Sequence, residues 1–148
     1  MNRRFFLFAL PVAATPLAAQ QADVWSAAQA GAALAAGDIV VLDIRSPEEW
    51  AETGVAKGAW PVTLHDEGFA NRLFAAREMA AGRPVALICA TGGRTDYVMQ
   101  ALRKGGYDGF VDVSEGMMGS VLGRGWIAAG LPVVSAETAL AALPDALR

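Results

Sequence analysis

The sequence is poor in the residues that build metal sites and disulfides. Its 148 residues include one cysteine, Cys89, and one histidine, His65. A single cysteine excludes a disulfide framework within the chain. A lone histidine without a second cysteine or a cluster of carboxylates offers no ligand set for a metal, so we expect no metal and no cofactor. The balance of 12 basic and 15 acidic residues also argues against a nucleic-acid partner.

Long hydrophobic runs are missing as well. The apolar run that starts at Phe5 is about ten residues long, against the roughly 20 that a membrane-spanning helix needs, so no stable membrane anchor is expected. Two arginines, this short run and the small residues after it have the layout of a signal peptide, which we place at residues 1–20. Its cleavage would leave a periplasmic or secreted protein with a net charge of about −5.

The export route stays open at this point. The segment "RRFFL" resembles a twin-arginine export signal, in which a pair of arginines is followed by phenylalanine and leucine. Asn2 and Phe8 depart from that pattern, and an ordinary secretory signal also begins with basic residues. The small residues before Ala22 permit cleavage at several positions.

In the rest of the chain, apolar segments typical of buried strands alternate with helical patterns. This alternation predicts an α/β fold: a three-layer sandwich with a central, mostly parallel sheet and helices on both faces. We expect one domain over residues 23–135 and a C-terminal tail or short helix over 136–148. The expected strands are 38–45, 58–64, 84–90 and 109–113, and the expected helices are 23–37, 46–54, 67–82, 94–106 and a last one within 120–133.

The segment "CATGGRT" places the thiol where chemistry is expected. Cys89 ends a buried strand and a helix begins near Arg94 or Thr95, so backbone N–H groups and the helix dipole can converge on the sulfur and favour its anionic form. Gly92 and Gly93 permit the backbone angles that such a loop needs. Arg94 adds a cation able to hold an anion bidentately, and Thr95 adds a hydroxyl.

These loop residues, together with "VLDIRSPEEW" and "VSEGMMGSVLGRGWIAAGLPVV", resemble the rhodanese sulfurtransferases over residues 25–134. The resemblance implies that Cys89 accepts a sulfane sulfur from a small donor such as thiosulfate and becomes a persulfide. The outer sulfur would pass to an acceptor such as cyanide, a thiol or a protein. The resemblance also implies that the loop binds the donor and the persulfide through Ala90, Thr91, Gly92, Gly93, Arg94 and Thr95.

Other residues are expected in supporting roles. Asp43 and Arg45 end the first long strand on the same side as the loop, and we interpret them as structural support, either by hydrogen bonds to the loop or by pairing with Glu48, Glu49 or each other. The segment "GVAKGA", residues 54–59, departs from the family's usual "GHIPGA", which affects local packing. Met117 and Met118 are either a soft cover over the sulfur or gap-filling residues.

Four alternatives accompany this hypothesis. Cysteine phosphatases also place a strand-end cysteine before an arginine, but their loops are one residue longer than the four residues that separate Cys89 from Arg94. An arsenate reductase with a similar loop needs a second cysteine, and this sequence has only one. A non-catalytic rhodanese-like binding module is the main alternative of another class. The simplest alternative is that Cys89 is only a buried apolar residue.

Overall fold

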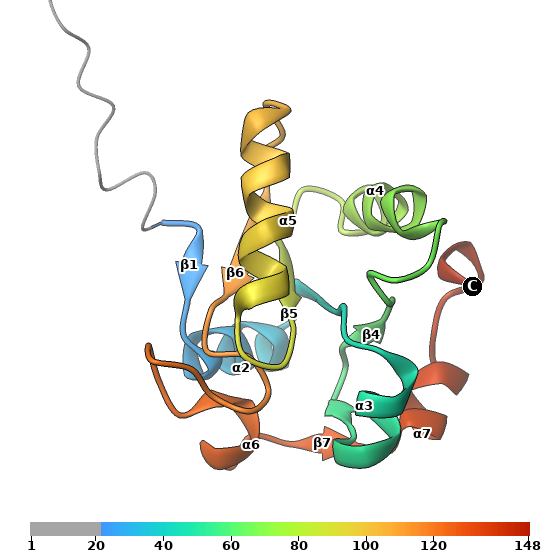
Figure 1. Ribbon diagram of the computed structural model, residues 1–148. Helices are drawn as coiled ribbons and strands as arrows, with labels where there is room; N and C mark the ends of the chain where they lie inside the picture. Colours follow the sequence, from blue (N-terminus) through green and yellow to red (C-terminus); the bar gives the residue numbers. More distant parts are fainter. Residues whose placement is uncertain (1–21) are drawn as a thin grey trace, which may run out of the picture.

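The computed structural model describes residues 22–148, so the expected signal peptide lies outside the described residues (Figure 1). Within 22–148, no helix combines the length and the apolar character needed to cross a membrane.

A five-stranded sheet forms the centre of the protein. Its strands run in the order β1-β6-β5-β2-β4, and all neighbouring pairs are parallel. A small antiparallel pair, β3 with β7, lies outside this sheet. The strands are β1 (Val24–Trp25), β2 (Val40–Asp43), β3 (Val55–Ala56), β4 (Trp60–Pro61), β5 (Val85–Ile88), β6 (Phe110–Val113) and β7 (Val133–Val134).

Helices cover both faces of the sheet (Figure 1). Alternate residues of β2 explain this: Leu42 joins the apolar cluster under α4 and α5, whereas Val41 joins the one that contains α2 and α6. The predicted three-layer α/β sandwich is therefore confirmed. The helices are α2 (Ala27–Ala36), α3 (Pro47–Thr53), α4 (Phe69–Met79), α5 (Gly93–Lys104), α6 (Gly125–Ala128), α7 (Ala136–Ala141) and the 3₁₀ turn η1 (Asp145–Leu147).

The helix boundaries follow local signals in the sequence. Ser46 caps α3 and Pro47 occupies its first turn, and Glu49 completes a capping box with Ser46. Gly37 ends α2 in a left-handed conformation with a φ of 76°. Pro61 lies on the edge strand β4, where its missing N–H costs no ladder hydrogen bond.

One expected helix was wrong in its extent. The helix predicted from residue 23 begins at Ala27, because Val24 and Trp25 pair with β6 as strand β1 and Ser26 caps the helix instead. The last predicted helix, within 120–133, is confirmed as the four residues of α6. In the C-terminal segment, α7 and η1 bury Ala139 and Leu147 against the body of the domain.

Candidate active site

Cys89 lies at the carboxyl edge of the central sheet, where β5 ends and α5 begins at Gly93. Asp43 ends the neighbouring strand β2 at the same edge, since β2 and β5 are parallel and Asp43 is paired in register with Ile88. Binding sites of open α/β sheets form at this edge. The loop 89–95 therefore occupies the position that the sequence predicts for a site.

Two groups of the loop contact the sulfur. The Gly92 N–H donates a hydrogen bond to Sγ over 3.2 Å, and the Thr95 hydroxyl lies 3.7 Å from it. The same hydroxyl donates to the Gly92 carbonyl over 3.1 Å. Cys89 is only 1% exposed, so its thiol forms the floor of the loop.

A second segment, residues 114–118, supports the loop through its backbone. Met117 N–H donates to the Cys89 carbonyl and Met118 N–H to the Ala90 carbonyl, both over 2.8 Å. Met117 is fully buried and fills the core, whereas Met118 is 54% exposed beside the loop. Gly116, with a φ of 70°, lies against the Ala90 carbonyl so closely that a Cβ would overlap it.

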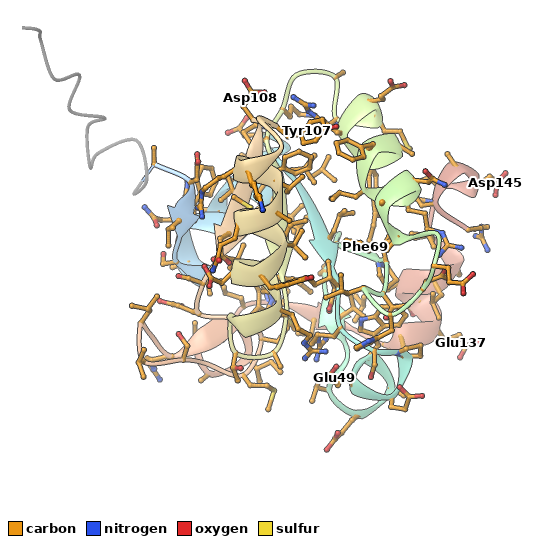
Figure 2. The ribbon with its side chains drawn as sticks, turned by 45° about the horizontal axis from the view of Figure 1, so that its top comes forward. Glu49, Phe69, Tyr107, Asp108, Glu137 and Asp145 are labelled. Atoms are coloured by element: carbon orange, nitrogen blue, oxygen red, sulfur yellow. The ribbon has the colours of Figure 1, made fainter. Side chains whose placement is uncertain are left out.

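The guanidinium of Arg94 is held by Glu49. Its two terminal nitrogens donate to the two carboxylate oxygens over 2.7 and 2.6 Å. These hydrogen bonds lower the pKa of Glu49 to about 2 and raise the pKa of Arg94. Figure 2 shows Glu49 on α3, next to the end of α5 that carries Arg94. The role of Arg94 toward an anionic donor stays a prediction.

Arg45 and Asp43 form a buried ion pair at 2.7 Å, with side chains 1% and 0% exposed. Arg45 also donates to the Thr53 hydroxyl and to the Gly54 carbonyl, each over 2.7 Å. The pair therefore attaches the C-terminal end of α3 to the end of β2. This arrangement positions α3, and with it Glu49, against the loop.

Asp112 is a buried carboxyl beside the loop that no sequence motif singles out. It is 5% exposed, and its Oδ1 has no hydrogen-bond partner among residues 22–148. With Thr91, Gly92 and Ser114 it lines a pocket of about 240 Å³. Burial, and secondarily the charge of Asp96, raises the pKa of Asp112, although Thr95 and Arg103 act in the opposite direction.

The remaining candidates lie apart from this site. His65 is exposed in the loop between β4 and α4, and its backbone N–H donates to the Thr63 hydroxyl. Among the described residues, no group of three or more His, Cys, Asp or Glu side chains is placed to hold a metal.

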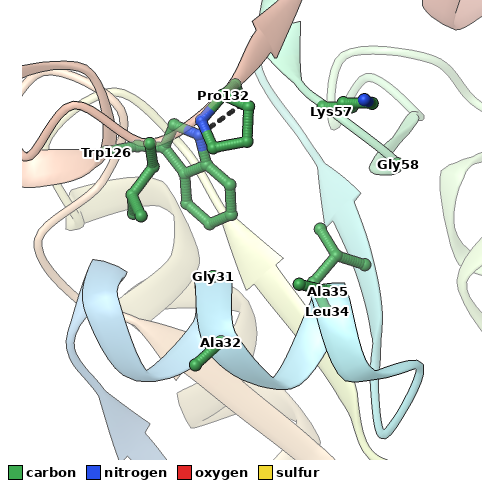
Figure 3. Close-up of a pocket in the computed structure, with 9 residues that line it drawn as sticks. Gly31, Ala32, Leu34, Ala35, Lys57, Gly58, Trp126 and Pro132 are labelled. Carbon is green, nitrogen blue, oxygen red and sulfur yellow. Dashed lines mark hydrogen bonds between the residues drawn. The ribbon is translucent and has the colours of Figure 1, made fainter.

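A larger pocket, of about 620 Å³, contains no residue of the loop 89–95 (Figure 3). It lies between α2 and the segment that follows α6. Its lining is mostly apolar, and the Trp126 indole N–H donates to the Pro132 carbonyl over 2.9 Å at its wall.

Comparison with known proteins assigns the family. The model of the rhodanese-like domain matches residues 26–120. Because this match covers well over half of the chain, the protein belongs to the rhodanese-like domain family. Membership of this family is consistent with sulfurtransferase activity but does not show it, because some rhodanese-like domains are not catalytic. No curated protein matches the chain.

Several solved structures share the fold. A full-length protein from Lactobacillus plantarum is 22% identical, with 80% of this chain and 92% of that chain covered and a TM-score of 0.56. A Rhodopseudomonas palustris protein of unknown function, described as a possible tyrosine phosphatase, is 21% identical, with 85% and 100% covered and a TM-score of 0.55. A protein from M. tuberculosis is 24% identical, with 74% and 94% covered and a TM-score of 0.54. At these identities the likeness shows the fold alone.

Replacing Gly92 with alanine is expected to destabilise the loop. Gly92 has a φ of 90°, and a Cβ there would overlap the Ser114 carbonyl oxygen. We expect the unfolding temperature to fall by about 5 °C or more. Gly93→Ala is the matched control, because a Cβ at Gly93 meets nothing within 4 Å. Equal unfolding temperatures of the two variants, measured by calorimetry, would contradict this account of the loop.

Asp112→Asn is expected to stabilise the protein at pH 7 and not at pH 3.5. The folded state raises the pKa of Asp112. The protonated carboxyl therefore contributes its full stability below the unfolded pKa of about 3.9, and this contribution is lost as the pH rises through the pKa of the folded state. The side-chain amide of the Asp112→Asn variant does not ionise, so the variant avoids this loss of stability at pH 7. Thermal unfolding at both pH values tests it, with Asp38→Asn as an exposed control. An advantage of the same size at both pH values would refute the assignment.

Proposed function

We propose that this protein is a sulfurtransferase that carries a sulfane sulfur on Cys89. The observation that carries the proposal is the position of Sγ at the floor of the loop, with the Gly92 N–H at 3.2 Å and the Thr95 hydroxyl at 3.7 Å. The Gly92 N–H donates to the sulfur, and the Thr95 hydroxyl can donate to a sulfur anion, the nucleophilic form of the thiol, by turning its proton from the Gly92 carbonyl toward Sγ. Membership of the rhodanese-like family supports the same chemistry.

With thiosulfate as donor, the reaction has two half-reactions. The Cys89 thiolate attacks the outer sulfur of thiosulfate, an S–S bond forms, and the original S–S bond breaks with its electron pair leaving on sulfite. Cyanide then attacks the outer sulfur of the persulfide, which releases thiocyanate and restores the thiolate. No proton has to move in either step, so the chemistry does not require a general base such as His65.

The loop backbone and the Thr95 hydroxyl have a binding role in this scheme. A persulfide moves the negative charge one atom outward from Sγ. We expect the peptide N–H groups at the start of α5 and the positive end of its dipole to stabilise that charge. We propose Ala90 to Arg94 as the cradle, with Asp43 and Arg45 as its structural support.

The second candidate function is that of a non-catalytic binding module. The burial of Cys89 favours it, because a thiol that is 1% exposed is poorly accessible to a donor. A phosphatase is disfavoured, because four residues between Cys89 and Arg94 make a loop tighter than a phosphoryl group needs.

Persulfide formation on Cys89 is the prediction that tests the proposal. The intact mass of the protein should rise by one sulfur atom after thiosulfate and return to its starting value after cyanide, with thiocyanate released. Cys89→Ser should show neither change. If thiosulfate gives no adduct, a low-molecular-weight persulfide is tried next. Absence of an adduct with both donors would reject catalysis and leave the binding module.

We also propose that the mature protein acts outside the cytoplasm, on a small sulfur donor and either a small or a protein acceptor. Residues 1–20 carry this proposal through their signal-peptide layout. Expression in a bacterial host should give a periplasmic protein whose N-terminus lies near residue 20. Replacing both Arg3 and Arg4 with lysine separates the routes: a loss of export indicates the twin-arginine route, and unchanged export the general one. A cytoplasmic product with an intact Met1 would contradict the proposal.

A further inference from the structure

The charge of Arg94 is already neutralised at the loop. Both of its terminal nitrogens bond the two oxygens of Glu49, and the two side chains are 29% and 31% exposed. Partial burial reduces the screening of this pair by water and salt. A donor that approaches Cys89 therefore meets an ion pair with no net charge, in place of a free guanidinium.

The other charges around the loop are also balanced or acidic. Arg45 is paired with Asp43 and fully buried. A pocket of about 100 Å³ beside the loop is lined by Glu49, Glu52 and the paired Arg45, and Glu52 has no ion-pair partner within residues 22–148. Met118 lines the same pocket and bonds the Ala90 carbonyl, which places the pocket next to the loop. No hydrogen bond or ion pair of the described residues brings another cation to the loop.

From this balance of charge we infer that Glu49 determines donor specificity: the site selects a sulfane-sulfur donor with at most one negative charge at its reacting end, such as an organic persulfide, over the thiosulfate dianion. The inference rests on the proposed sulfurtransferase function. Glu49 acts through Arg94 and is thus a positioning residue. Thiosulfate still reacts, but it gains no attraction from the paired Arg94 and is repelled by the unpaired carboxylate of Glu52.

Methanethiosulfonate is a suitable probe, because it replaces one oxygen anion of thiosulfate with a methyl group and keeps the S–S bond. The Cys89 thiolate attacks its terminal sulfur, the donor S–S bond breaks, and the electron pair leaves on methanesulfinate. The persulfide formed on Cys89 is the same as that formed from thiosulfate. The two donors therefore differ at the site by one charge.

The test variant is Glu49→Gln. A glutamine at position 49 can still accept the hydrogen bond from the Ser46 N–H that caps α3, so the helix start is kept while the charge is removed. Glu48→Gln is the matched control, since Glu48 lies on the same helix, is exposed, and has no contact with Arg94. Unfolding temperatures of both variants establish that they fold.

The measured quantity is the ratio of kcat/KM for thiosulfate to kcat/KM for methanethiosulfonate. Glu49→Gln should raise this ratio about three- to tenfold, mainly through a lower KM for thiosulfate, because the freed guanidinium attracts a dianion more than a monoanion. Glu48→Gln should change it less than about twofold.

The salt dependence provides a second readout that a purely structural role would not move. For the wild type, kcat/KM for thiosulfate should stay constant or rise with ionic strength, whereas for Glu49→Gln it should fall. An unchanged ratio in Glu49→Gln, or a wild-type rate with thiosulfate that falls steeply with salt, would overturn the inference. If neither donor loads Cys89, the proposed function fails; if both load it and the ratio does not move, only this inference fails.

Discussion

The buried guanidinium of Arg45 is the contact on which the arrangement of the site depends. It joins Asp43, at the end of β2, to Thr53 and Gly54, at the end of α3. A buried ion pair is stable only when its remaining donors are satisfied, and here the hydroxyl and carbonyl at the end of α3 satisfy them. The helix is thereby fixed against the sheet edge, and Glu49 is brought within reach of Arg94.

The site thus combines a sulfur stabilised by its own loop with a surrounding surface that holds little net charge. The stabilisation of the sulfur is local, since it comes from the Gly92 N–H and from Thr95, three and six residues after Cys89. The charge balance is not local, because the carboxylate of Glu49 that pairs with Arg94 lies on α3, 45 residues earlier in the chain. Under the proposed function, the first part would govern whether sulfur is carried, and the second would govern which molecule delivers it.

The sequence alone predicts the fold and the position of the loop, because both follow from local signals: apolar runs of strand length, a serine and a proline at a helix start, and glycines after a strand-end cysteine. It does not predict the pairing of Arg94 with Glu49, which are 45 residues apart. Ser46 and Pro47 predict the start of α3, but they do not show which loop the carboxylate of Glu49 reaches. Strand β1 was missed for a similar reason, because a two-residue strand is defined by its partner β6.

The two glycines at the loop have a further consequence for how this sequence can change. Gly92 and Gly116 each lie against a backbone carbonyl, that of Ser114 and that of Ala90 respectively. Every residue type carries the same carbonyl, so no substitution at position 114 or 90 can make room for a side chain at either glycine. Many core positions can exchange volume with a neighbour through paired substitutions, but these two glycines have no neighbour with which to exchange it.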